Sequence, residues 1–300
     1  MRILNFGSLN LDYVYQVPHF VTPGETLAAV KQDVHPGGKG LNQSIALARA
    51  GAKVYHAGAV GRGGEPLARL LKENGVNTEY LQTVDCLQGN AVIQVTPSGE
   101  NCILLYGSSN RAVTKQHVDE TLKHFEKGDY LVLQNEISHI PYIIEKAAGI
   151  GMQIVLNPSP YDANLEGIDY NHISWLLINE VEGRQITGET EPEKIWKTLN
   201  SRYPSMNVVL TLGRKGAVCF TKGESIYQPI FDVKVADTTA AGDTFTGFFL
   251  AGLVGGKSVR ECLRIASKAS SISVSRPGAS VSIPTAAEVE ASEITEVKPD

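Results

Sequence analysis

The chain has 300 residues, 42% of them hydrophobic, which suits one large α/β domain with an ample core. Its net charge of −5 comes from 27 basic and 32 acidic residues that are interspersed, so no basic block marks a nucleic-acid surface. No apolar run approaches a membrane span, the N-terminus lacks a signal-peptide pattern, and the four cysteines form no Cys-x-x-Cys pair. We therefore expect a soluble, cytoplasmic protein that binds neither nucleic acid nor membrane.

Residues 3–7 predict a buried strand, and Asn10 and Asp12 follow it. An Asn and an Asp after a strand are typical of a turn. They also suit a polyol, since a carboxylate accepts hydrogen bonds from hydroxyl groups and an amide both donates and accepts them. Open α/β sheets bind ligands at the carboxyl ends of their parallel strands, which favours the binding interpretation.

Two segments interrupt an otherwise regular alternation of strands and helices. Residues 13–36 contain Pro and Gly and have no helical period. Residues 91–95 and 102–106 are strand-like and flank a Pro/Gly turn, which predicts a hairpin. We expect a single domain over residues 1–300, with two insertions, at about 13–36 and 90–107, that form a small β-sheet over the site.

The rest of the chain reads as strand–helix units. Gly37-Gly38-Lys39-Gly40 introduces a helix that ends near Gly51, and a strand and a helix follow at 54–60 and 66–74. Further strands are predicted at 130–134, 153–157, 174–178 and 208–212, with helical segments between them. This pattern predicts a doubly wound, mostly parallel sheet flanked by helices.

The stretch from 231 to 250 predicts a strand at 231–235, a turn of small residues, and then a helix. Ala240, Ala241 and Gly242 carry almost no side chain, so a ligand can approach their backbone closely. A helix N-terminus has unpaired N–H groups and a partial positive charge, which suits an anion such as phosphate. Asp243 lies at the same place, and local sequence alone fits either a helix cap or a catalytic base.

A resemblance favours the base. Residues 237–245, Asp-Thr-Thr-Ala-Ala-Gly-Asp-Thr-Phe, are similar to the C-terminal signature of the ribokinase family of ATP-dependent sugar kinases, the phosphofructokinase-B group. Residues 37–43, Gly-Gly-Lys-Gly-Leu-Asn-Gln, resemble its N-terminal signature. The resemblance implies a ribokinase-like fold with a β-sheet lid, pairing of lids in a homodimer, and Asp243 as the catalytic base. The backbone of Ala240, Ala241 and Gly242 would then stabilise the transferred phosphoryl group.

The same resemblance implies the other ligands of the site. The sugar-facing residues would be Asn10, Asp12, Gly38, Lys39, Asn42, Glu136 and Asp243. ATP would contact Asn179, Thr211, Gly213 and Gly242, and Glu182 would act on Mg²⁺ through water, although Asn179 and Glu182 also fit a helix capping box. A K⁺ site would use Asp237, Thr239, Ser273, Arg276, Gly278 and Ser282, mostly through backbone oxygens.

The sugar-facing set fits D-ribose best, which implies transfer of the γ-phosphoryl group of MgATP to give ribose 5-phosphate. Deoxyribose, fructose or a nucleoside are the alternatives, with Tyr13, Tyr15 or Phe20 available to contact a base. Ser108, Ser109 and Arg111 depart from the family pattern, and Arg111 fits either a surface position or a larger, anionic substrate. A sensor without turnover is a second class, disfavoured because a sensor needs no base beside an anion site.

Overall fold

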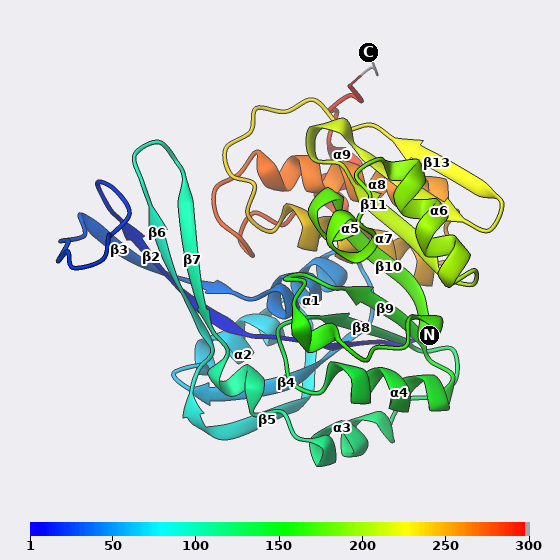
Figure 1. Ribbon diagram of the computed structural model, residues 1–300, viewed down its shortest axis with the longest axis horizontal. Coiled ribbons are helices and arrows are strands. Elements are labelled where there is room, and N and C mark those ends of the chain that lie inside the picture. The colour runs from blue at the N-terminus through cyan, green and yellow to red at the C-terminus, as the bar shows by residue number, and fades with distance from the viewer. Residues whose placement is uncertain (298–300) are drawn as a thin grey trace.

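Nine strands form the main sheet, in the spatial order β13-β12-β11-β10-β9-β8-β1-β4-β5 (Figure 1). The structure, a computed structural model, describes residues 1–297. The strands of this sheet are β1 (Ile3–Phe6), β4 (Val54–Arg62), β5 (Asn77–Leu87), β8 (Tyr130–Gln134), β9 (Gln153–Asn157), β10 (Ile173–Asn179), β11 (Asn207–Thr211), β12 (Ala217–Thr221) and β13 (Glu224–Gln228). The helices are α1 (Lys39–Arg49), α2 (Glu65–Glu73), α3 (Lys115–Leu122), α4 (Ile140–Ile150), α5 (Glu180–Thr187), α6 (Pro192–Arg202), α7 (Ala241–Val254), α8 (Val259–Val274) and α9 (Ala286–Ala291).

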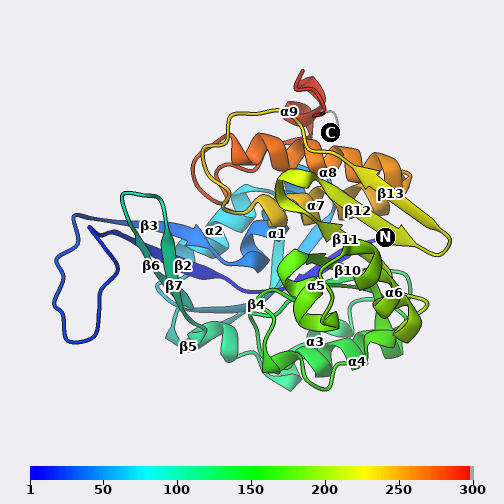
Figure 2. The same ribbon diagram turned by 45° about the horizontal axis from the view of Figure 1, so that its top comes forward.

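The main sheet is parallel from β5 to β11, and only β12 and β13 pair antiparallel. Helices cover both of its faces, as the two views show (Figures 1 and 2). The predicted doubly wound, mostly parallel sheet is therefore confirmed. Since parallel strands end at the same edge, the chain segments that follow β1, β8, β9, β10 and β11 converge there.

The alternation of side chains along the strands divides the core into two layers. Ile3, Val132 and Val155 face a layer that contains the apolar sides of α1, α2, α7 and α8. Their neighbours Leu4 and Leu131 face the other layer, with α3, α4 and α6. Strands buried on both faces explain why the sequence reads there as continuous apolar runs. Within residues 1–297, no helix has the length and apolar composition needed to cross a membrane.

A second sheet extends away from the main one, at the left of Figures 1 and 2, and we refer to it as the lid. It contains four strands in the order β3-β2-β6-β7. They are β2 (Asn10–Gln16), β3 (Lys31–Gly37), β6 (Asn90–Val95) and β7 (Asn101–Tyr106). Asn10 pairs with Gly37 at its base, so β2 and β3 meet the main sheet where β1 ends and α1 begins.

The expected strand at 231–235 was wrong. Phe231 forms only an isolated bridge with Glu296, and its N–H donates to the hydroxyl of Ser271 in α8 at 3.2 Å. The alternating apolar side chains of this segment, Phe231, Val233 and Val235, line a pocket instead of a sheet. The edge strands β5 and β13, and β12 beside β13, were not predicted.

Candidate active site

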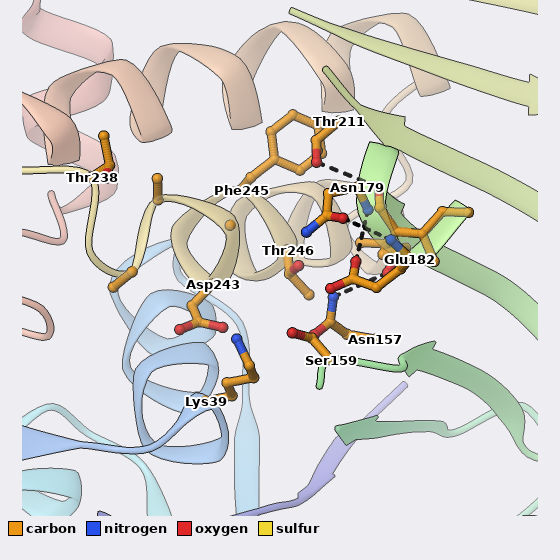
Figure 3. Close-up of a pocket in the computed structure, with 15 residues that line it drawn as sticks. Lys39, Asn157, Ser159, Asn179, Glu182, Thr211, Thr238, Asp243, Phe245 and Thr246 are labelled. Atoms are coloured by element: carbon orange, nitrogen blue, oxygen red, sulfur yellow. Dashed lines mark hydrogen bonds between the residues drawn. The ribbon is translucent and has the colours of Figure 1, made fainter. Parts of the chain in front are cut away.

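A pocket of about 230 Å³ lies where the carboxyl ends of β9, β10 and β11 meet the N-termini of α1 and α7 (Figure 3). Figure 3 shows the side chains of Lys39 and Asp243 together on one side of it, and those of Asn179 and Glu182 on the other. The predicted site residues in its lining are Lys39, Asn179, Glu182, Thr211, Ala240, Ala241, Gly242 and Asp243. Asn157, Ser159, Thr238, Phe245 and Thr246 also line it and were not predicted to do so.

The first turn of helix α7 borders this pocket. Ala240, directly before it, has a left-handed backbone with φ 59°, and the N–H of Ala241 turns back to the carbonyl of Thr238 at 3.3 Å. For the N–H groups of Gly242 and Asp243, no backbone acceptor lies within the described part of the chain. A Cβ on Gly242 would meet no atom within 4 Å, so the space in front of it is open. The N-terminus of α7 therefore offers donors and a partial positive charge to an anion in the pocket.

The carboxylate of Asp243 is buried and held by two amides from α1. Asn42 donates through Nδ2 to one oxygen at 3.0 Å, and Gln43 donates through Nε2 to the other at 2.9 Å. Lys39 begins the same helix. Burial alone would lower the pKa of the Lys39 ammonium, but nearby carboxylates, Asp243 foremost, raise it overall. The site thus places a fixed carboxylate beside a lysine that stays charged.

The residues predicted to face the sugar gather at the base of the lid, next to Asp243. Glu136, after β8, is buried, and its Oε2 accepts from the N–H of Lys39 at 3.1 Å and from the hydroxyl of Ser8. Burial raises the pKa of Glu136, opposed by the positive charge of Lys39. Gly38 has φ 94°, and a Cβ there would lie 3.0 Å from the N atom of Asn10. Glu136 therefore ties the start of α1 at Lys39 to Ser8, which lies between β1 and β2.

We refer to the polar side chains of Asn10, Asp12, Asn42 and Glu136 as the polyol-facing cluster. Asp12 and Asn42 are its members best suited to bind the hydroxyl groups of a polyol. Burial, with the charge of Glu136, raises the pKa of Asp12 to about 7. Oδ1 of Asn42 is buried and accepts no hydrogen bond from residues 1–297. An unpaired buried amide oxygen is costly, and a ligand hydroxyl would satisfy it.

Asn110 belongs to the same cluster but was not among the predicted site residues. Its Nδ2 donates to Oδ1 of Asn10 at 2.7 Å, and its Oδ1 accepts from the N–H of Leu9 at 3.0 Å. This contact leaves the Asn10 amide nitrogen to face a ligand. The sequence contained a signal for it, because Asn110 lies between Ser109 and Arg111, in the segment where the departures from the family pattern occur.

Arg111 does not enter the pocket. It lies in the short helix η1 (Ser108–Arg111), is exposed, and donates through NH1 to the carbonyl of Ile137 at 3.0 Å. The hydroxyl of Ser109 accepts from the N–H of Gly89 at 2.9 Å. The departures at Ser109 and Arg111 thus anchor the turn that carries Asn110, and the geometry gives no role to Arg111 in binding a charged substrate.

A second pocket of about 310 Å³ continues from the first, and both are lined by Thr211, Gly242 and Phe245. Its walls include the apolar side chains of Ile230, Phe231, Val233, Val235 and Val274 and serines of α8. Gly213, with φ 54° and no atom within 4 Å of a Cβ, opens its rim. An apolar slot that leads to a helix N-terminus has the shape of a site for a nucleotide base and its phosphates.

Asn179 and Glu182 form the capping box of α5. Oδ1 of Asn179 accepts from the N–H of Glu182 at 3.0 Å, and Oε2 of Glu182 accepts from the N–H of Asn179 at 2.8 Å. Both side chains still line the first pocket. One carboxylate at the phosphate end fits Mg²⁺, which keeps several waters and takes one or two carboxylates.

The residues expected around K⁺ lie in two segments that touch. Oδ2 of Asp237 accepts from the N–H of Gly278 at 2.9 Å, and Oδ1 accepts from the N–H and the hydroxyl of Thr239. Ser273 and Ser282 are buried, with their hydroxyl oxygens 2.8 Å apart. The N–H of Arg276 donates to the carbonyl of Ser273 at 3.0 Å, while its guanidinium pairs with Glu288. A set made of oxygens fits a hard cation.

Comparison with known proteins gives a consistent result. The family model described as "pfkB family carbohydrate kinase" matches residues 2–286. The ribokinase of Haemophilus influenzae is 35% identical over 288 residues, which are 93% of this chain and 94% of that protein. Among solved structures, a ribokinase from Cryptococcus neoformans in complex with ADP has a TM-score of 0.84 at 33% identity, covering 96% of this chain and 98% of that one. A ribokinase from Arabidopsis thaliana complexed with ribose and ATP has a TM-score of 0.83 at 29% identity, covering 96% and 97%.

Proposed function

The chain belongs to the pfkB family of carbohydrate kinases, and from this premise we propose that it transfers the γ-phosphoryl group of MgATP to the primary hydroxyl of D-ribose, giving ribose 5-phosphate. The observation that carries the proposal is the position of Asp243. Its carboxylate lies between the polyol-facing cluster at the base of the lid and the helix N-terminus that ends the nucleotide slot. An acceptor hydroxyl and a terminal phosphate would meet at that carboxylate.

The polyol-facing residues supply both donors and acceptors. Asp12 in its ionised form accepts from hydroxyl groups, and Asn10 presents its amide nitrogen because Asn110 occupies its oxygen. Oδ1 of Asn42 accepts a further hydroxyl. A furanose with several hydroxyls satisfies such a set, whereas an apolar ligand would leave it unpaired. This supports a sugar as the acceptor, and the relative from Arabidopsis thaliana supports ribose.

Asp243 acts as the general base. A carboxylate is far too weak to deprotonate an alcohol in advance, so it takes the proton late, as the bond from oxygen to phosphorus forms. The N–H groups of Gly242 and Asp243 and the ammonium of Lys39 stabilise negative charge on the group in transfer. Most of the rate enhancement then comes from alignment and charge neutralisation.

Two cations complete the proposed site. Glu182 would hold Mg²⁺ through its water ligands, and the ion supplies charge neutralisation at the phosphates. Asp237, with the oxygens of residues 273–282, would hold K⁺ beside the loop that leads into α7. Because Asp237 and Ala240 belong to that same loop, a cation there would steady the N-terminus of α7.

The lid would close over the sugar and exclude water, which otherwise competes as phosphoryl acceptor. Its outer strand β7 is exposed along its whole length and contains Ile103, Leu104, Leu105 and Tyr106. An apolar edge strand of this kind is a ready surface for pairing with another chain. We propose that the protein forms a homodimer through contacts of β7. As the sequence predicts, it would work in the cytoplasm.

ADP release with MgATP and a panel of ribose, deoxyribose, fructose and several nucleosides, each with and without K⁺, tests the proposal. Saturable turnover on ribose that K⁺ increases is the expected result. A preference for another sugar or a nucleoside would keep the mechanism and replace the substrate. Binding of sugar and ATP without turnover, at any K⁺ concentration, would contradict the kinase and leave a sensor.

A further inference from the structure

The two carboxylate oxygens of Asp243 accept hydrogen bonds from two side chains that differ in their access to ligands. Asn42 belongs to the polyol-facing cluster. Gln43, which bonds Oδ1 at 2.9 Å, is fully buried and lines neither pocket. Gln43 therefore contacts the base but has no access to sugar or nucleotide.

Gln134, at the end of β8, orients the Gln43 amide from behind. Its Nε2 donates to Oε1 of Gln43 at 2.7 Å and to Oδ1 of Asn5 at 2.9 Å. Both hydrogens of that nitrogen are thereby used. The oxygen of Gln43 consequently faces Gln134, and its nitrogen faces Asp243.

Asn5, in the central strand β1, fixes the direction of the whole series. Its Nδ2 donates to the carbonyl oxygen of Gly40 and to the hydroxyl of Ser44, each at 2.8 Å. A carbonyl accepts only, so Asn5 presents its nitrogen to Gly40 and its oxygen to Gln134. The series thus runs between two groups that only accept, the Gly40 carbonyl and the Asp243 carboxylate, and every amide in it has one orientation.

This arrangement carries a cost that packing does not explain. Oε1 of Gln134 is buried and has no hydrogen-bond partner in the described part of the chain. An unpaired buried amide oxygen is unfavourable, and the two hydrogen bonds that Gln134 donates to Gln43 and Asn5 are what keeps this side chain in place. A buried unsatisfied group in a native protein points to a functional reason.

We propose that Gln43 is a positioning residue for phosphoryl transfer, and that Gln134 and Asn5 hold it in the orientation that the reaction needs. The inference rests on the proposed function, because it takes Asp243 as the base. One N–H of Gln43 occupies one lone pair of Oδ1 and fixes the plane of the carboxylate. The remaining lone pairs are then aimed at the acceptor hydroxyl before substrate arrives.

The primary test is Gln43→Met, which keeps the length of the side chain and removes its donor. A misaligned base should lower kcat roughly 10- to 100-fold while leaving the KM for ATP nearly unchanged. Since an N–H donor favours the ionised carboxyl over the protonated one, the acid limb of the kcat–pH profile should move to higher pH. Gln228→Met is the matched control, because Gln228 is also buried but its side chain donates only to the carbonyl of Pro229.

Two further variants separate positioning from packing. Gln43→Glu keeps the shape and donates only when protonated, so its kcat relative to wild type should recover as pH falls. Gln134→Met should lower kcat less than Gln43→Met, and the double variant should be no slower than Gln43→Met alone, because both changes break one series. A pH profile that stays in place in Gln43→Met, or additive losses in the double variant, would overturn the proposal.

The geometry can also be checked without turnover, which separates this inference from the proposed function. Wild-type activity on the sugar panel tests the function alone. The side-chain NH₂ resonances of Gln43 in a ¹⁵N spectrum should exchange slowly with solvent and should shift in Asp243→Asn and Gln134→Met, but not in Gln228→Met. Fast exchange of those protons in the wild-type protein would contradict the positioning role even if the enzyme phosphorylates ribose.

Discussion

The amide of Asn42 donates to the carboxylate of Asp243 across 3.0 Å, although the two residues are 201 positions apart in the chain. Asn42 lies in the first turn of α1, and Asp243 lies in the first turn of α7. The two helix N-termini, each introduced by small residues, thus converge on one carboxylate. The two sequence signatures of the family are joined physically at this contact.

Asp243→Asn should lower kcat roughly 10²- to 10⁴-fold, the usual contribution of a general base. The KM values for sugar and ATP should change much less, because the amide has the size of the carboxylate. Its NH₂ group would face one of the two amides that now donate to Asp243, so stability should fall by about 1–3 kcal/mol. Steady-state kinetics and urea unfolding measure the two effects, and turnover near that of the wild type would exclude Asp243 as the base.

The sequence predicted the parts of this site that local patterns define. The turn of Ala240, Ala241 and Gly242 marks the start of α7, and residues 37–40 mark the start of α1, because small residues before an apolar helical period are visible along the chain. The parallel sheet was predicted for the same reason, since strands buried on both faces are apolar throughout.

Contacts between distant segments were not predictable in this way. Gln43 reads as an ordinary helix residue, and only the fold brings it to Asp243, 200 positions away. The error at 231–235 has a related cause. Alternating apolar residues predict a strand whether their partner is a sheet or a ligand pocket, and here Phe231, Val233 and Val235 line the pocket.

Asn110→Ala should raise the KM for the sugar about tenfold, with the KM for ATP unchanged, because loss of one well-placed hydrogen bond is worth roughly 1–1.5 kcal/mol. The Asn10 amide would lose the contact that turns its nitrogen toward the ligand. Asn207→Ala is a suitable control. The side chain of Asn207 donates to the carbonyl of Ser174, as that of Asn110 does to the carbonyl of Leu9 at 3.2 Å, and Asn207 lines neither pocket. An equal change of both KM values in Asn110→Ala would show that the residue shapes the fold and not the sugar site.

Stability of the ligand-free protein should depend on pH through Asp12. Its pKa is about 7 in the folded state and near 3.8 in the unfolded chain, so the folded state binds the extra proton between these values. The free energy of unfolding therefore falls as pH rises from about 4 to 7. Asp12→Asn removes this loss. The free energy of unfolding of the variant, relative to that of the wild type, should therefore increase from pH 5 to pH 8 by up to about 3 kcal/mol. A stability difference that is the same at pH 5 and pH 8 would show that Asp12 is not the group responsible.

Asp237→Asn should raise the K⁺ concentration that gives half-maximal activity by about tenfold or more, because a charged ligand contributes more than a neutral one. The NH₂ group introduced at position 237 would also point at the N–H of Gly278 or Thr239 and could not accept a hydrogen bond from it. Asp169→Asn provides the control, since Asp169 also accepts from the N–H two residues ahead, at 2.9 Å, but lies in a surface turn. Titrations of K⁺ at saturating MgATP and ribose measure the effect. If Asp237→Asn and the wild type respond equally to K⁺, the cation does not bind at this loop.

A charge on the outer strand of the lid should convert a dimer to monomers. The exposed fractions of Ile103 and Leu104 are 60% and 71%, and no Pro, Lys or Arg protects β7 as one would protect a free edge. Leu104→Asp would bring two carboxylates together across a symmetric contact and desolvate both, which is strongly unfavourable. Sedimentation velocity should then show a dimer for the wild type and a monomer for Leu104→Asp. Val281→Asp, a charge at a 67% exposed position outside the lid, should leave the dimer intact. If Leu104→Asp still sediments as a dimer, the subunits associate through another surface and β7 is covered in some other way.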